Sequence, residues 1–213
     1  MLIRQIRTGG DRNLAYLVAD SSARIALVID PSYAPDKPVR VAHQAAVSIR
    51  RAFCTHGHHD HTNGNPQFER LTGVRPLLFG DIDPLTRTSV SDSAKFPLGE
   101  LTVQVIHTPG HTPDSICLLI GDALFTGDTL FVGKVGGTDL GRGAEQLYAS
   151  LHDKLLALPP ATRVFPGHDV GVASESTIAH ERETNPFLRC PDLDSFIHLK
   201  RTWASYKKEH GIA

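Results

Sequence analysis

The chain has 213 residues, and 40% of them are hydrophobic, which is enough for a domain with an ordinary apolar core. The formal net charge of −1, with no long basic run and no apolar stretch long enough to span a bilayer, predicts neither nucleic-acid nor membrane partners. Three cysteines without a CxxC pair, and an N-terminus without a signal-peptide pattern, predict a cytoplasmic protein with free thiols.

Short apolar runs separated by turn residues begin the chain and predict a β-meander. The predicted strands are Leu2–Arg7, Leu14–Ala19 and Ile25–Asp30. Val39–Ile49 is expected to form a helix with Pro38 in its first turn, where a missing backbone N–H is tolerated. A buried strand is predicted at Arg51–Thr55, and it leads into a segment rich in histidine.

The rest of the chain alternates between apolar runs and segments with helical spacing. Further strands are predicted at Leu77–Phe79, Leu101–His107, Ile116–Ile120, Ala123–Thr126 and Val164–Phe165. Further helices are predicted at Asn65–Leu71, Ala144–Ala157, Glu175–Glu183 and Ser195–Lys208. Because no linker rich in Gly, Ser or Pro divides the chain, we predict a single α/β domain over residues 1–213, with a C-terminal helix at about 192–209 docked on it.

The most informative segment is Thr55–Gly64, which places His56, His58, Asp60 and His61 directly after a predicted buried strand. Imidazole and carboxylate are the ligand types that suit zinc, iron or manganese. We expect the segment to be a loop, because only a loop can point so many closely spaced ligands in different directions.

Three later candidate ligands, His111, Asp128 and His168, each follow a glycine at the end of a predicted strand. Glycine at such a position permits a tight turn or a close approach of the backbone. Together with the first segment they give five histidines and two aspartates. Two metal ions that share one carboxylate would need about this many protein ligands.

The motifs HxHxDH, TPGHT, GDT and GH occur in this order and resemble those of the metallo-β-lactamase superfamily. The resemblance extends from Val28–Pro31 to Asn185–Leu188, and THGHHDH, TPGHTPDS, FTGDTLF and STIAHERETNPFL are similar to the group of glyoxalase II and the persulfide dioxygenases. It implies an αββα sandwich, in which two mixed sheets are flanked by helices and the metals lie at one edge.

The same resemblance implies two metal half-sites. The first metal would be held by His56, His58 and His111. The second would be held by Asp60, His61 and His168. Asp128 would bridge two divalent metals (zinc, or zinc mixed with iron or manganese) together with a hydroxide. That hydroxide, oriented by Asp60 as a catalytic residue, would hydrolyse an activated acyl group, most plausibly a thioester.

Two alternatives stay open at this point. A single Fe(II) held by His56, His111 and Asp128 would leave positions for O₂ and a thiol, as in the persulfide dioxygenases that this chain resembles, which oxidise glutathione persulfide. A metal-binding protein without turnover is the other alternative. Gly137 stands where this group has a basic residue, so Lys134 and Arg142 are the candidate substrate-binding residues for a small-molecule thioester or thiol. The sequence is compatible with a homodimer.

Three further interpretations concern residues outside this ligand set. We interpret His59 as a residue that is either exposed or in contact with a ligand, and Cys54 and Cys117 as buried core thiols. Trp203 and Tyr206 are interpreted as the side chains by which the last helix docks on the body.

Overall fold

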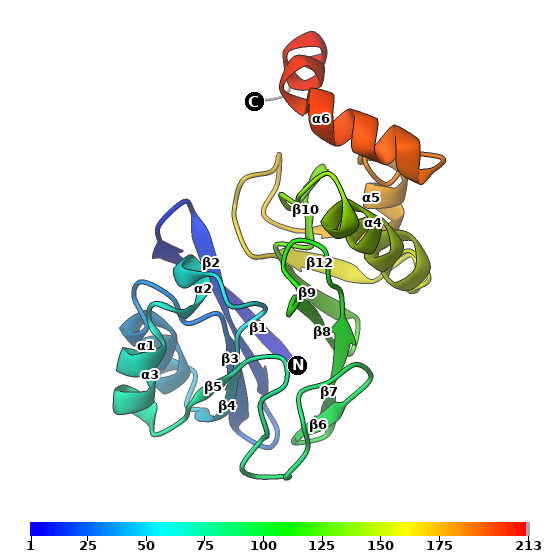
Figure 1. The fold of residues 1–213 in the computed structure, drawn as a ribbon. Helices are drawn as coiled ribbons and strands as arrows, with labels where there is room; N and C mark the ends of the chain where they lie inside the picture. The colour runs from blue at the N-terminus through cyan, green and yellow to red at the C-terminus, as the bar shows by residue number, and fades with distance from the viewer. Residues whose placement is uncertain (212–213) are drawn as a thin grey trace.

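The structure is a computed structural model that describes residues 1–211, and its N-terminal half forms a five-stranded mixed sheet (Figure 1). The strands in spatial order are β1 (Leu2–Gly9), β2 (Asn13–Asp20), β3 (Ile25–Ile29), β4 (Ser48–Phe53) and β5 (Pro76–Leu77). The first three pair antiparallel, as the predicted meander requires, whereas β3, β4 and β5 are parallel because helical crossovers connect them.

The second sheet has six strands in the order β13-β12-β9-β8-β7-β6. Their bounds are β6 (Lys95–Leu98), β7 (Leu101–His107), β8 (Ile116–Ile120), β9 (Ala123–Gly127), β12 (Arg163–Pro166) and β13 (Ser176–Thr177). Only β9 and β12 pair in parallel in this sheet. A two-stranded ribbon of β10 (Leu130–Phe131) and β11 (Lys134–Val135) follows β9.

Helices cover the outer face of each sheet (Figure 1). The first sheet carries α1 (Asp36–Gln44) and α3 (Asn65–Thr72), with the single turn α2 (His59–Thr62) between β4 and α3. The second carries α4 (Arg142–Ala149), which continues into the π-helical turn Ser150–Leu155, together with α5 (Ile178–Thr184) and α6 (Leu193–His210). The predicted αββα sandwich of two mixed sheets flanked by helices is therefore confirmed.

Strand β2 shows how the sequence builds the layers, because every residue in it is buried. Leu14, Tyr16 and Val18 pack between the two sheets. The alternate residues, Ala15, Leu17 and Ala19, face the layer of α1 and α3. Side chains on a strand point to alternate faces, so a strand covered on both sides has no polar face, and two small alanines leave room for the helices.

Several predicted boundaries were wrong, and local chemistry explains two of them. The helix predicted at Val39–Ile49 ends at Gln44, because Ala46 turns the chain with a φ of 52° and residues 48–49 pair with β3. The helix predicted at Glu175–Glu183 begins only at Ile178, where Thr177 caps it by accepting a hydrogen bond from the His180 backbone N–H. The first residues of that segment form β13 instead.

The remaining predictions of secondary structure agree with the structure to within a few residues, apart from three short elements. Strand β6 and the ribbon β10–β11 had no predicted counterpart, and the histidine-rich segment contains the helical turn α2 where only a loop was expected. Within residues 1–211, no helix has the length and apolarity that a membrane span requires. The predicted domain extent of 1–213 stays a prediction, and its last two residues lie outside the described part.

Candidate metal centre

All seven candidate ligands gather at one edge of the sandwich, where strands from both sheets end. His56, His58, Asp60 and His61 follow β4, and the other three follow β7, β9 and β12. The glycine before His168 permits close approach, since a Cβ on Gly167 would lie 2.7 Å from Asp128 Oδ1. The strand ends thus bring together residues that are up to about a hundred positions apart in the sequence.

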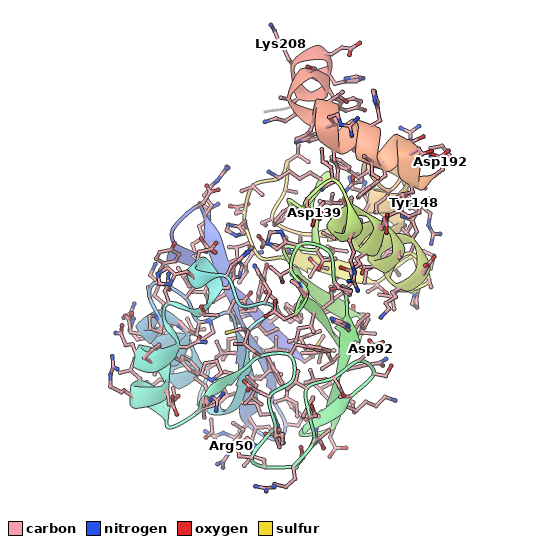
Figure 2. All side chains as sticks on the ribbon, viewed as in Figure 1. Arg50, Asp92, Asp139, Tyr148, Asp192 and Lys208 are labelled. Carbon is pink, nitrogen blue, oxygen red and sulfur yellow. The ribbon has the colours of Figure 1, made fainter. Side chains whose placement is uncertain are left out.

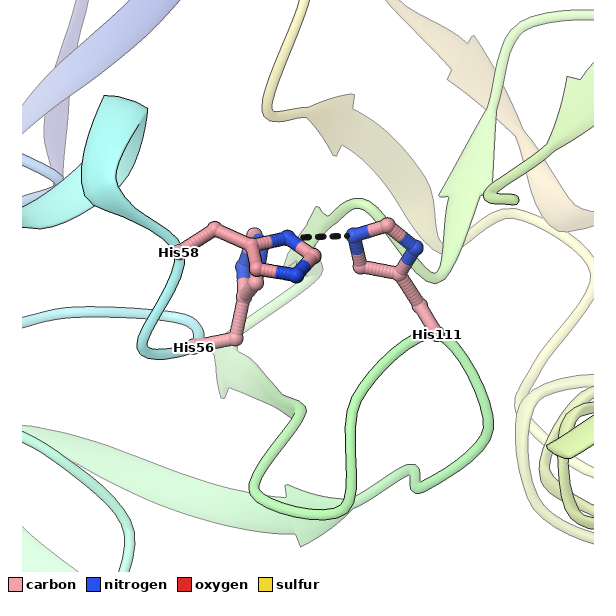
Figure 3. A group of neighbouring side chains, drawn as sticks. All are labelled: His56, His58 and His111. Atoms are coloured by element: carbon pink, nitrogen blue, oxygen red, sulfur yellow. Dashed lines mark hydrogen bonds between the residues drawn. The ribbon is translucent and has the colours of Figure 1, made fainter. Parts of the chain in front are cut away.

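The first half-site consists of three histidine rings from two loops, shown in Figure 3. The Nδ1 atom of His58 lies 3.0 Å from Nε2 of His56 and 3.0 Å from Nε2 of His111. His56 is buried, whereas His58 is exposed, so one side of this half-site opens to solvent. Three ring nitrogens that converge on one point in this way are suited to bind a cation.

The second half-site consists of Asp60, His61 and His168. The two ring Nε2 atoms lie 3.1 Å apart, and Asp60 Oδ2 lies 3.5 Å from that of His61 and 3.3 Å from that of His168. Asp60 is only half-buried, while both histidines are buried.

Asp128 reaches both half-sites with different oxygen atoms. Its Oδ2 lies 3.6 Å from His111 Nε2, and its Oδ1 lies 3.3 Å from His61 Nε2 and 3.4 Å from His168 Nε2. Oδ1 is a buried atom to which the described residues give no hydrogen-bond partner. A buried carboxylate oxygen without a partner is costly, and a metal cation shared with the histidines would satisfy it.

The outward nitrogens of the rings fix which atom faces the centre. Nδ1 of His111 lies 2.7 Å from the Gly137 carbonyl oxygen, and Nδ1 of His168 lies 2.7 Å from the Asp11 carbonyl oxygen. Since carbonyl oxygens only accept, each Nδ1 must donate, and in the neutral ring each Nε2 keeps its lone pair toward the centre. This is the tautomer that a metal ligand requires.

Asp30 is a functional residue that the sequence analysis did not identify. It follows β3 with a φ of 49°, is buried, and accepts hydrogen bonds from the Thr55 N–H (2.7 Å) and hydroxyl (2.8 Å). Its Oδ2 also lies 3.0 Å from His61 Nδ1, and Thr55 Oγ1 lies 3.2 Å from His56 Nδ1. Asp30 therefore orients His61 directly and His56 through Thr55. The one feature of the sequence that could have indicated this role is a carboxylate at the end of a predicted strand.

Asn13 is the second residue that was missed. Its Nδ2 atom donates to Asp60 Oδ2 at 3.0 Å and to the Asp60 carbonyl oxygen at 3.1 Å. Its backbone also forms an isolated β-bridge with His168. Asn13 thus fixes the Asp60 side chain beside the second half-site, and nothing in the local sequence pattern indicates this role.

Protonation differs between the two half-sites in the metal-free protein. Burial and the neighbouring His61 lower the pKa of His56 to about 3, and burial also lowers the pKa of His111. Burial opposes a proton on His61 as well, but the Asp30 and Asp128 carboxylates outweigh it and raise the pKa of His61 well above its ordinary value. For Asp128, the neighbouring His168 and His61 outweigh burial and lower its pKa strongly.

Residues 133–138, here called the strap, run past the first half-site and contain the predicted substrate residue Lys134. Buried Glu181 accepts from the Gly133 N–H at 2.9 Å, and Asn185 donates to the Lys134 carbonyl oxygen at 3.3 Å. The segment Ser176–Leu188, which contains both residues, therefore holds the strap in place through these hydrogen bonds. Lys134 is half-buried against Phe131, whereas Arg142 is exposed at the start of α4, and their substrate roles stay predictions.

The other interpreted residues lie as expected. His59 is exposed, and Cys54 and Cys117 are buried. Trp203 and Tyr206 pack against the core beneath α6, with the Trp203 ring centroid 4.7 Å from that of Phe187.

Comparisons with known proteins agree with this geometry. The sequence profile of the metallo-beta-lactamase superfamily matches residues 8–168. The chain is 38% identical over 187 residues to a hydroxyacylglutathione hydrolase of Alkalilimnicola ehrlichii, covering 83% of this chain and 69% of that protein. It is 30% identical over 199 residues to the mitochondrial persulfide dioxygenase ETHE1 of Bos taurus, covering 88% of this chain and 76% of the relative.

Similarity in structure is equally extensive. The crystal structure of ETHE1 from Myxococcus xanthus matches with a TM-score of 0.85 and 33% identity, covering 95% of this chain and 91% of that one. The chain therefore belongs to the metallo-beta-lactamase superfamily, in the group that contains glyoxalase II and the persulfide dioxygenases.

Proposed function

We propose that this chain is a dinuclear metallohydrolase that cleaves thioesters. The observation that carries the proposal is Asp128, whose two oxygens face different half-sites and whose buried Oδ1 has no other partner among the described residues. A site for one ion would need only one of the three overlapping groups of ligand-type atoms that these residues form.

The donor set fits two divalent ions of borderline character. Imidazole nitrogens and carboxylate oxygens suit zinc, iron and manganese, and no thiol takes part, because Cys54 and Cys117 are buried in the core. When bound, the two ions would supply an activated water molecule at neutral pH and would polarise the substrate carbonyl.

Asp60 is the residue we propose to orient the attacking water. Its carboxylate is half-exposed beside the second half-site, and Asn13 fixes Oδ2 with a hydrogen bond of 3.0 Å. Burial opposes ionisation, but the bond from Asn13 and the charges on His61 and His168 outweigh it and lower the pKa of Asp60. Asp60 therefore stays ionised near neutral pH and can accept a hydrogen bond from the water.

A pocket of about 600 Å³ beside the second half-site is the proposed place for the thiol half of the substrate. Its lining includes Arg12, Val132, Lys134, Val172 and Trp203. Val170 and Gly171 of the lining follow His168 directly in the chain, and the Phe131 ring, at the start of the ribbon, lies 6.0 Å from the ring of His168. Two cations among apolar walls suit an apolar acyl or thiol chain with an anionic substituent.

The first test is the metal content of the protein purified without added metal, measured by elemental mass spectrometry. About two equivalents of zinc, manganese or mixed zinc and iron, together with hydrolysis of thioesters, would support the proposal. Two bound metals with no measurable turnover of thioesters or persulfides would instead support a metal-binding protein without catalysis.

A persulfide dioxygenase is the second candidate. Two similarities favour it: the extensive structural match to ETHE1 from Myxococcus xanthus, and the 30% sequence identity to the bovine persulfide dioxygenase. A single Fe(II) on His56, His111 and Asp128 would leave positions for O₂ and the sulfur substrate. About one equivalent of iron with little other metal, and O₂ uptake with glutathione persulfide, would favour this candidate over the hydrolase.

We propose a cytoplasmic location, supported by three free cysteines, two of which are buried. A homodimer stays a prediction, which size-exclusion chromatography with light scattering would test.

A further inference from the structure

Lys200, on helix α6, is a cation outside the metal centre for which the proposed reaction gives no role. Its ammonium donates a hydrogen bond of 2.7 Å to the carbonyl oxygen of Gly136 in the strap. It lies 5.5 Å from the ring centroid of Phe187 and 5.4 Å from that of Phe196. Burial lowers its pKa to about 8, so the surroundings of the ammonium are partly dry. A hydrogen bond from a partly desolvated cation is stronger than one exposed to water.

The strap that Lys200 contacts also holds the first half-site. The carbonyl oxygen of the next residue, Gly137, accepts from His111 Nδ1 at 2.7 Å. One residue further, the Thr138 hydroxyl donates to the Gly110 carbonyl oxygen at 2.7 Å. Three consecutive residues of the strap thus join α6 to both His111 and the residue before it.

The strap has no room to move toward the metal centre. A Cβ on Gly136 would lie 1.9 Å from the Asp128 carbonyl oxygen and 3.2 Å from His111 Nδ1. The backbone of Gly136 therefore packs directly against the backbone of one predicted ligand and the ring of another. If the strap moved away from Lys200, His111 would move with it. The hydrogen bond between His111 and Gly137 is short, and Gly136 packs tightly against the His111 ring.

We propose that Lys200 is a positioning residue that fixes the ring of His111, and with it the first half-site, from the C-terminal helix through the strap. This role rests on the proposed metal centre. It also gives α6 a part in the chemistry beyond the packing of Phe196 and Leu199 onto the body. The helix is remote from the N-terminal sheet that delivers His56 and His58, so residues from both ends of the chain would support the first half-site (Figure 1).

The test uses Co²⁺ as the probe, because its visible absorption reports the ligand geometry of each bound ion. Metal-free wild type, K200M, K200R and K208M are titrated with Co²⁺ while stoichiometry, affinity and absorption spectrum are recorded. Methionine keeps the apolar stem of the lysine but cannot donate to Gly136. Lys208 is the matched control, since it is an exposed lysine near the outer end of the same helix (Figure 2).

We expect K200M to weaken one of the two Co²⁺ equivalents by about tenfold and to change the spectrum of that equivalent only. K200R should restore the spectrum, because a guanidinium can also donate to the carbonyl, and K208M should match wild type. If K200M unfolds, K200Q, which shortens the donor and removes its charge, takes its place with the same expectations.

Two results would overturn the inference. One is that K200M, or K200Q in its place, binds both equivalents with the affinities and spectra of wild type. The other is that the variant raises KM while both spectra stay unchanged, which would make Lys200 a substrate ligand. Wild-type protein that binds fewer than two equivalents would overturn the proposed dinuclear function itself, so the two failures are distinguishable.

Discussion

The first half-site, built from His56, His58 and His111, differs from the second, built from Asp60, His61 and His168, in how its histidines are charged. His56 and His111 have lowered pKa values and are neutral near pH 7. His61 and His168 have raised pKa values, because burial is outweighed by Asp30 and Asp128 for the former and by Asp128 for the latter. His56 and His111 can therefore bind a cation without losing protons, whereas His61 and His168 must release them.

The Asp128 carboxylate faces both regions, so its loss should have the largest effect. D128N keeps the size of the side chain but removes its charge, and we expect thioesterase activity to fall by about 10³-fold. Metal content should fall from about two equivalents to one or fewer. D122N is the matched control, because Asp122 is an exposed aspartate that pairs with Arg163. Full activity in D128N would contradict a shared carboxylate.

Asp30 supports the second half-site directly and the first only through Thr55, so its loss should separate the two. D30N should weaken the metal equivalent of the second half-site by about 10–100-fold and the other equivalent less, as measured by competition with a chelator. D36N, at a half-exposed aspartate that pairs with Arg40 away from the candidate ligands, is the control. Equal weakening of both equivalents would mean that the path through Thr55 matters as much as the direct contact with His61.

The difference in protonation predicts a pH dependence that belongs to the second half-site. Below its raised pKa, His61 holds a proton that a metal must displace, so affinity for that equivalent should fall by about tenfold per pH unit for each displaced proton. The first equivalent should change less than the second between pH 6 and 8, because the pKa values of His56 and His111 are lowered. Chelator competition at several pH values measures the affinity of each equivalent. Parallel curves for the two equivalents would contradict a pH dependence that arises mainly in the second half-site.

Metal affinity of the second half-site should fall as the pH falls, whereas the stability of the metal-free protein should fall as the pH rises. A raised pKa means that folded His61 binds its proton more tightly than the unfolded chain does. Its contribution to the free energy of unfolding is therefore fully present below about pH 6.5 and is lost as the pH rises through the folded pKa. Denaturant unfolding in the presence of a chelator measures this, and D30N should flatten the curve.

The sequence identified the candidate ligands that gather at one edge of the fold but not the residues that support them, and the reason is physical. His56, His111, Asp128 and His168 follow apolar runs that form strands, so a local pattern places each at a strand end. Asn13 and Asp60 are 47 positions apart and Asp30 and His61 are 31 apart, and they meet because β2, β3 and β4 are neighbours in the first sheet. A single sequence shows which residues are neighbours along the chain, but it does not show which loops meet.

The same limit applies to the fold. The alternation of apolar residues predicted most strands and the layers, because it follows from which face of each strand is buried. It did not predict the ribbon β10–β11, whose four residues are too few for a period to show. The strap after β10 depends on Glu181, Asn185 and Lys200, which come from α5 and α6 far along the chain.

The smallest predicted effect compares Lys134 and Arg142, the two cations expected from the sequence to bind substrate. Lys134 lines the pocket beside the second half-site, and burial together with nearby Lys207 and Arg12 lowers its pKa, so an anion there would relieve repulsion between cations. K134M should raise KM for a thioester of an anionic thiol up to about fivefold, with little change in kcat. Because Arg142 is exposed at the start of α4, R142M should leave KM unchanged. A thioester of a neutral thiol is the control substrate, and an equal rise in KM for both thioesters would mean that Lys134 shapes the pocket without recognising charge.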